Sequence, residues 1–446
     1  DSIKYNNAEI VDDGEILVIN NGYEERFGSL ESAMAKAITY NTFTQVKLLA
    51  DATITSDITI PSNKYIQLDL NGKTIKYYSN VNTIKAFINN GRFELTDSLG
   101  NGKIEVIADG YDAYGVCNNE SIAMFKQLGG NIEVISRGAN AYGISNSGEG
   151  LEAIVIDGGS ISAKAEIGTN SIKSGIAYGI YNASDGTIMV GGNSTKIVAK
   201  SDLNDGYGIY DNEKNNELFI GEKDGLTNSN SPYISGNTYG VYKEDAGKFA
   251  LYGGSVTGPT SKSTNRKFNE KEENTALYTL DNLDGTETQL LLKNIDSIVG
   301  VPKQLTFNKI GLTKSFEVSY LPIDASDVTI TYEIKSGDVV DVTESYNTYK
   351  LKSKAEGSAV MKITARDITG KEVFAICNII VDLTAPTDTA PDATSTATSV
   401  KITCKQEDEN IDANTIRYAI SSDGGLTWGT WTSRSTISGL TPDKEY

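Results

Sequence analysis

One short phrase, a tyrosine followed by a glycine and an aliphatic residue, returns five times in the middle of this chain. The phrase stands at 114–116, 142–144, 178–180, 207–209 and 239–241. Its tyrosines are 28 to 36 residues apart, which suits stacked coils joined by loops of different length. Glycine pairs precede strand-like runs at 131–134, 160–161 and 255–256. Each unit thus holds two or three short strands separated by turn residues, and the repeat predicts a parallel β-solenoid.

The repeat also predicts which side chains face inward, because strand side chains alternate between two faces. Aliphatic residues are expected to stack inward, followed by asparagines that can form a hydrogen-bonded ladder; these are Val116, Ile144, Ile180, Ile209 and Val241, then Asn118, Asn146 and Asn182. Tyr181, Tyr210 and Tyr242 then face outward as an aromatic strip. The tyrosines that open each phrase share the parity of the aliphatic residues. We therefore expect them in the core or at corners: Tyr114, Tyr142, Tyr178, Tyr207 and Tyr239.

The region 10–294 resembles the right-handed parallel β-helix that pectate-lyase-like enzymes share with many bacterial surface proteins. An amphipathic helix is predicted over 30–40, with Ser29 placed as its N-cap. The strand-like runs that follow it resemble the entry coils of bacterial surface β-helices. A solenoid has to cover its open end, so we expect the helix to act as an N-terminal lid. The resemblance identifies an architecture and leaves the activity open.

Two further modules are expected after the solenoid (1–294), and the whole chain is predicted to be all-β. Region 298–382 has strands spaced as in a β-sandwich and resembles a bacterial Ig-like (group 2) domain, with Tyr332 where that family usually has tryptophan. Residues 383–395 are expected to be a linker. Region 396–446 resembles a fibronectin type III domain, because Leu440, Pro442 and Tyr446 have the spacing of its tyrosine corner. That module would lack its final two strands, so we expect the natural protein to be longer.

Composition argues against several kinds of chemistry. The 446-residue chain has a formal net charge of −19 and a pI near 4.6, which argues against binding to nucleic acids or anionic membranes. It has no histidine, and this removes Ser-His-Asp, Cys-His and histidine–zinc sites. Its three cysteines are too scattered for a disulfide framework, and Cys404 is expected to be a buried thiol. With no run of 18 apolar residues, no membrane-spanning segment is expected.

One set of residues allows an enzymatic interpretation. Asp112 and Asp205 each stand two residues before a repeat tyrosine, and Arg137 lies just before the matching position of another coil. Pectate-lyase-like enzymes combine acidic calcium ligands with a basic residue. The resemblance therefore implies a lyase or hydrolase site at these three residues, with calcium as its cofactor if the chain is an enzyme; otherwise no cofactor is expected. We favour the simpler interpretation that they are turn residues bonding their own backbone, because a glycine stands within two residues of each.

The aromatic strip favours binding over catalysis. Rows of aromatic rings can stack on sugars, and the polar residues beside the strip could bond sugar hydroxyls: Asn182, Asp211 and Asn212. The simpler interpretation, which we favour from the residues alone, is that the tyrosines only stabilise the sheet. Trp428 and Trp431 carry the same two interpretations, with the structural one again favoured. We expect a non-catalytic adhesion protein, secreted or attached to the cell surface or cell wall, whose partner is an extracellular glycan or a protein of a host or neighbouring cell. The alternatives are a carbohydrate-active enzyme, either a polysaccharide lyase or a glycosidase, and a structural spacer.

Overall fold

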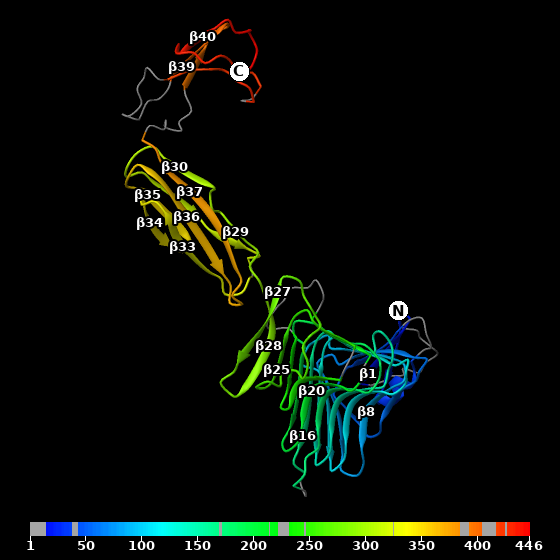
Figure 1. Ribbon diagram of the computed structural model, residues 1–446. Helices are drawn as coiled ribbons and strands as arrows, with labels where there is room; N and C mark the ends of the chain where they lie inside the picture. The colour runs from blue at the N-terminus through cyan, green and yellow to red at the C-terminus, as the bar shows by residue number, and fades with distance from the viewer. Residues whose placement is uncertain are drawn as a thin grey trace. The chain divides into compact units, whose positions relative to one another are not determined.

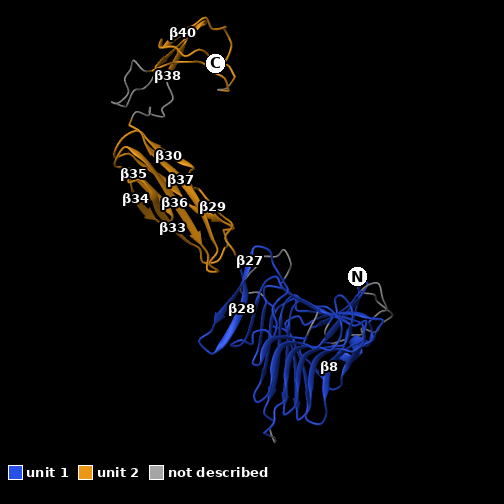
Figure 2. Cartoon of the chain, in the orientation of Figure 1, with its two compact units in different colours: residues 1–293 blue, residues 294–446 orange. Residues whose placement is uncertain are grey.

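The chain divides into two compact units, residues 1–293 and 294–446 (Figure 2). The computed structural model describes residues 15–37, 43–168, 172–213, 215–221, 232–244, 247–323, 325–383, 392–403, 416–423 and 426–446. Cys404, expected to be a buried thiol, lies outside these ranges. Among the described elements strands far outnumber helices (Figure 1), so the chain is all-β as predicted.

The described strands of unit 1 form three sheets, here called I, II and III. Sheet I has the order β2 (Tyr23–Phe27), β1 (Ile16–Asn20), β3 (Thr44–Leu48), β6 (Tyr65–Asp69), β9 (Arg92–Thr96), β12 (Met124–Gln127), β15 (Ile154–Ile156), β18 (Ile188–Val190), β21 (Glu217–Ile220), β24 (Lys248–Leu251) and β26 (Glu270–Lys271). Sheet II has the order β27 (Thr275–Asp281), β28 (Thr286–Lys293), β25 (Ser255–Pro259), β22 (Tyr233–Gly236), β19 (Lys196–Ser201), β16 (Ser160–Glu166), β13 (Asn131–Arg137), β10 (Lys103–Asp109), β7 (Thr74–Ser79) and β4 (Ala52–Ile54). Sheet III has the order β23 (Tyr239–Lys243), β20 (Gly206–Asp211), β17 (Ala177–Asn182), β14 (Ala141–Asn146), β11 (Ala113–Asn118), β8 (Ile84–Asn89) and β5 (Ile58–Ile60).

The chain visits the three sheets in turn, so neighbouring strands within a sheet are one coil apart in sequence. Most neighbours are parallel and in register, as where Ile132 pairs with Ile104 on one side and Ile161 on the other. Antiparallel pairs occur where β1 meets β2 and β3, and where β28 meets β25 and β27. The inward aliphatic side chains form one continuous core. Parallel strands stacked in long sheets are the arrangement of a β-helix, which confirms that part of the prediction.

A short helix, α1 (Leu30–Ala35), precedes the first parallel strands. Ser29 is its N-cap, because the Ser29 Oγ accepts a hydrogen bond from the backbone N–H of Ser32 at 3.2 Å. The apolar side of the helix is buried and contacts β1, β2, β4 and β5. The helix ends at Ala35 and not at residue 40 as predicted; residues 38–42 lie outside the described ranges. No helix in the described part of the chain has the length and apolar character needed to cross a membrane.

Unit 2 contains separate, mostly antiparallel sheets. One has the order β30 (Gln304–Phe307), β37 (Glu372–Val381), β36 (Gly357–Arg366) and β33 (Thr329–Ser336), and another β31 (Thr313–Glu317), β35 (Thr348–Ser353) and β34 (Val340–Ser345). Their buried residues belong to a single core, in which the Tyr349 ring meets Phe316 and Tyr332. Two smaller sheets pair β29 (Ser297–Val299) with β32 (Ser319–Leu321), and join β38 (Asp392–Ser395), β39 (Ser399–Thr403) and β40 (Thr436–Ser438).

Candidate functional site

The repeated phrase lies on five consecutive strands of sheet III, β11, β14, β17, β20 and β23. Its tyrosines form two adjacent columns along the solenoid. The first column is Tyr114, Tyr142, Tyr178, Tyr207 and Tyr239, and the second is Tyr181, Tyr210 and Tyr242. These eight residues are here called the tyrosine face.

The positions of the first-column tyrosines differ from the prediction, which placed them in the core or at corners. They stay outside the buried core cluster and, apart from the largely covered Tyr178, are half-buried. The reason is the glycine that follows each of them. Gly115 is skipped in the register, which pairs Tyr114 with Tyr142 and then Val116 with Ile144. Gly143 of the partner strand is skipped as well, so the two strands stay in register while the alternation shifts by one residue. A tyrosine and the residue three positions later therefore share the outer face.

The glycine is required because neighbouring coils come very close at this position. A Cβ built on Gly143 would lie 2.5 Å from the carbonyl oxygen of Gly179 and 2.3 Å from the Cγ2 of Ile161. The equivalent glycines meet the same obstacle: a Cβ on Gly179 would lie 2.4 Å from the carbonyl oxygen of Gly208. Glycine thus fixes both the local coil spacing and the outward direction of the tyrosines.

The rings of each column stack face to face. In the first column, successive centroids are 4.3, 5.0, 5.7 and 6.2 Å apart with interplanar angles of 2 to 15°. In the second, the distances are 5.7 and 4.9 Å with angles of 7 and 8°. Rings of different columns meet edge to face, as where Tyr207 and Tyr210 are 4.8 Å apart at 70°. At the two ends, Lys85 lies 5.4 Å from the Tyr114 ring and Lys262 lies 5.8 Å from the Tyr239 ring.

This geometry revises what the tyrosine face can offer a ligand. The ring faces that sugar stacking requires are covered by neighbouring rings, or approached by lysines at the ends. Apart from Tyr178 these tyrosines are half-buried, and two of their hydroxyls bond acidic side chains: Tyr207 donates to Asp205 at 3.1 Å and Tyr242 donates to Glu244 at 3.5 Å. Burial is the main reason why the pKa of Tyr114 is raised to about 12 and why those of Tyr142, Tyr207 and Tyr210 also lie above the ordinary value. The hydroxyls of these four tyrosines therefore stay neutral near pH 7, and a neutral phenol can both donate and accept hydrogen bonds.

Behind the tyrosine face, the predicted asparagine ladder is present inside the coils. Asn118 Nδ2 donates to Asn146 Oδ1 at 3.0 Å, and Asn146 Nδ2 donates to Asn182 Oδ1 at 2.7 Å. Asn89 extends the ladder at one end, and Asp211 accepts from Asn182 Nδ2 at 2.9 Å at the other. Each spare N–H also finds a backbone carbonyl, as Asn118 does with Ala153, so these buried amides are satisfied.

The ladder changes the expected set of ligand-binding residues. Asn182 and Asp211 have no exposed surface, so neither can reach a ligand on the tyrosine face. Both side chains point inward because each follows an outward tyrosine, Tyr181 or Tyr210, and the side chains of a strand alternate between its two faces. Asn212 is exposed and stays a candidate. The sequence did not point to Lys85 and Lys262, which come close only because their strand and loop lie beside the ends of the first column.

The three candidate catalytic residues do not form one site. Asp112 accepts a hydrogen bond from the backbone N–H of Asn140 in the next coil at 2.9 Å, so it links two coils and does not make the local turn bond that the simpler interpretation predicted. Asp205 accepts from the hydroxyls of Tyr207 and Thr238. Asp112 and Asp205 are three coils apart, about 14 Å at the usual strand spacing. Carboxyl pairs that cleave glycosidic bonds lie about 5–9.5 Å apart.

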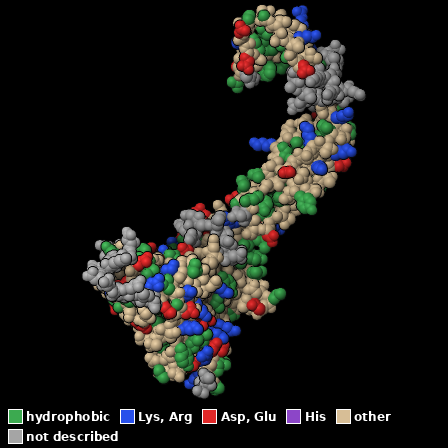
Figure 3. Space-filling view, turned by 180° about the vertical axis from the view of Figure 1, so that it is seen from behind, with side chains coloured by type: hydrophobic (Ala, Val, Ile, Leu, Met, Phe, Trp, Pro, Cys, Tyr) green, Lys and Arg blue, Asp and Glu red, His purple; other side chains and the backbone are tan. Residues whose placement is uncertain are grey.

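Arg137 belongs to a charge ladder on sheet II. Its Nη1 lies 2.8 Å from Asp109 Oδ1 and its Nε 3.0 Å from Glu166 Oε2. The hydrogen bond with Asp109 is the main reason why the pKa of the Arg137 guanidinium is raised, which makes it a poorer base. Acidic and basic side chains are interspersed on the side of unit 1 that Figure 3 shows. Among the described residues no group of three or more acidic or cysteine side chains is placed to hold a metal ion.

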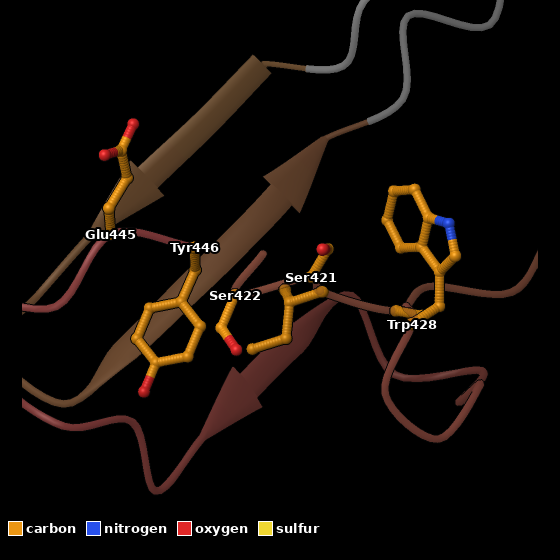
Figure 4. Close-up of a pocket in the computed structure, with 7 residues that line it drawn as sticks. Ser421, Ser422, Trp428, Glu445 and Tyr446 are labelled. Atoms are coloured by element: carbon orange, nitrogen blue, oxygen red, sulfur yellow. The ribbon is translucent and has the colours of Figure 1, made fainter. Parts of the chain in front are cut away.

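Two of the hollows elsewhere in the described residues border Trp428 and sheet I. One, of about 570 Å³, is in unit 2 and is lined by Ser421, Ser422, Trp428 and Tyr446 among others (Figure 4). Trp428 is 56% exposed and Trp431 59%, so this pair lies on the surface. The other hollow, of about 390 Å³, is on sheet I and is lined mainly by apolar residues of β15, β18 and β21.

No protein-family model matches this chain, and no curated protein matches it.

Proposed function

We propose that the chain is a non-catalytic surface protein that binds a neutral, polyhydroxylated ligand, an extracellular glycan, on the tyrosine face. The observation that carries the proposal is the double column of stacked tyrosines. Their hydroxyls recur about every 5 Å along the solenoid, the spacing of neighbouring strands. An extended glycan lying along this axis would meet a regular series of neutral donors and acceptors.

The remaining parts of the chain are assigned supporting functions in this proposal. The solenoid is a right-handed β-helix, and α1, packed against the first strands, covers its N-terminal end. Unit 2 comprises an Ig-like and a fibronectin type III-like module, which act as a stalk at a bacterial cell surface or cell wall. The mostly antiparallel sheets and the shared core around Tyr349 support a sandwich for the first of these modules.

The test is binding of the full chain to a glycan array, beside the triple variant Tyr181→Phe/Tyr210→Phe/Tyr242→Phe. Phenylalanine preserves the ring stacking and removes only the hydroxyls. A hydrogen bond contributes about 0.5–1.5 kcal/mol and 1.4 kcal/mol is a tenfold change in affinity, so three lost bonds weaken binding by about tenfold or more. Unchanged binding by the variant would contradict the proposal.

A matched control removes three other hydroxyls from unit 1, in Tyr23→Phe/Tyr78→Phe/Tyr233→Phe. The first two side chains are exposed, and all three lie outside sheet III. This variant should bind like the wild type. The same wells are assayed for unsaturated sugars and new reducing ends, and either product would replace the binding proposal with a carbohydrate-active enzyme.

A further inference from the structure

The asparagine ladder ends on charged residues. β20 and β23 are neighbours in sheet III, and their register places Asp211 beside Lys243 at the position that asparagine occupies in earlier coils. Neither side chain has any exposed surface, and Lys243 Nζ lies 2.9 Å from Asp211 Oδ2. A lysine that is fully buried is rare and needs a specific reason.

A third side chain completes this buried cluster. Asn216, in the turn before β21, is 1% exposed. Its carboxamide oxygen accepts a hydrogen bond from Lys243 Nζ, and its Nδ2 donates to Asp211 Oδ1 at 2.8 Å. The Asp211 carboxylate thus contacts both the Lys243 amine and the amide nitrogen of Asn216. The Lys243 amine also contacts the amide oxygen of Asn216. The carbonyl carbon of Asn216 is one C=O bond, about 1.2 Å, beyond the oxygen that the amine contacts.

We propose that Lys243 and Asn216 form an intramolecular isopeptide bond, with Asp211 as the catalytic proton carrier. Asp211 Oδ2 takes a proton from the Lys243 ammonium, and the freed lone pair on Nζ attacks Cγ of Asn216. A second proton leaves Nζ as the new C–N bond forms. Asp211 delivers both protons to Nδ2, the carboxamide C–N bond breaks, and one ammonium ion leaves. Mass and charge balance without an external reagent, and Asp211 returns to its carboxylate form.

Asn216 is the acyl donor in this step, and Asp211 is not. An ionised carboxylate is a poor electrophile, and its conversion to an amide would require loss of water. The two oxygens of Asp211 instead face the nucleophile and the leaving nitrogen, the arrangement that proton transfer between them requires. Burial supports the reaction by holding the reacting groups together and by keeping water from the intermediate.

The bond would be a covalent staple between consecutive coils. It joins the turn before β21 to β23, positions 27 residues apart. The staple would lie inside the coils directly beneath the tyrosine face, because Asp211 and Lys243 each follow a tyrosine of its second column. The proposal does not depend on the identity of the ligand on that face.

The experiment is the intact mass of the full chain under denaturing conditions, followed by tryptic peptide mapping. The expected mass is lower than the sequence mass by one ammonia, with no cleavage after Lys243 and a branched peptide that joins residues 216 and 243. Lys243→Arg keeps the charge but lacks the reactive amine, and Asp211→Asn continues the ladder but cannot carry protons. Both variants should have the full sequence mass.

Three results would overturn the proposal. They are a wild-type chain of full mass that trypsin cleaves after Lys243, a loss of water instead of ammonia, and a loss of ammonia that persists in Lys243→Arg. The wild-type measurement decides the question even if neither variant folds.

Discussion

Substitution of Gly143 by alanine has two opposing effects on the free energy of unfolding. Alanine is better suited than glycine to a strand, but its Cβ has no room between the closely packed coils. The φ angle of Gly143 is not positive, so alanine fits the backbone there. By itself the change would stabilise the protein by about 0.4–1 kcal/mol, since alanine loses less conformational entropy on folding. The new Cβ, however, would lie 2.3 Å from Ile161 Cγ2 and 2.5 Å from the Gly179 oxygen. Carbon atoms in good contact are about 3.5–4.0 Å apart, so the coils must separate by about 1 Å.

Overpacking of this kind costs about 1–3 kcal/mol, and both obstructing atoms are held in place by the core and the backbone. With the entropy gain subtracted from the upper end of that range, the net loss is about 2 kcal/mol. At a urea slope of about 2–3 kcal/mol per M, the unfolding midpoint falls by about 0.7–1 M. The measurement is urea unfolding followed by far-ultraviolet circular dichroism, with the near-ultraviolet tyrosine signal as a second probe of the stacked columns.

Gly28→Ala is the matched control. Gly28 also lacks a positive φ, and a Cβ built there would have no atom within 4 Å. Its midpoint should equal or slightly exceed that of the wild type. A Gly143→Ala midpoint as high as that of the control would refute the argument that glycine sets the coil spacing.

Three further predictions concern the charge ladder, the tyrosine face and the asparagine ladder. The hydrogen bond with Arg137 lowers the pKa of Asp109, and Lys164 first and Arg137 second lower that of Glu166. A lowered carboxyl pKa stabilises the fold above about pH 4, and this stabilisation is lost as the pH falls. Arg137→Met should therefore cost up to about 1 kcal/mol at pH 7 in thermal unfolding, and nothing once both carboxyls are protonated. Burial raises the pKa of Tyr114 to about 12, against about 10 in the unfolded chain. The free energy of unfolding should therefore decrease as the pH rises from about 10 to 12. In a pH titration, the tyrosinate absorbance of the folded protein should appear at higher pH than that of the unfolded chain. Asn146→Ala leaves buried ladder partners unsatisfied and should lower the free energy of unfolding by about 2–4 kcal/mol in urea titrations.

The coil repeat and the inward asparagine column could be predicted because they follow from local patterns. Val116 and Asn118 recur at fixed offsets from each phrase, and stacked coils place equal offsets in register. Ser29 could be identified as a cap because N-caps depend on a few neighbouring residues. The Asp211–Lys243 pair could also have been found, since both occupy the asparagine position of their coils.

The candidate site was predicted less well, because strict alternation was assumed through a glycine that interrupts it. That assumption assigned Tyr114 and its equivalents to the core or to corners, so it predicted one outward column of tyrosines where the structure has two. Asn182 was assigned to the surface strip and to the ladder at once, and its full burial decides for the ladder.

The sequence by itself determined that each repeat consists of short strands separated by turns, since hydrophobic alternation and turn residues act over a few positions; the structure decided that the strands of the coils lie in three sheets. It also determined the absence of histidine chemistry. Only the tertiary structure decided which side chains from different coils meet: tyrosine rings with their faces covered, an arginine between two carboxylates, and a lysine in contact with an asparagine 27 residues away. Such contacts depend on how closely the coils approach, and that distance is set by packing between residues that are remote in the sequence.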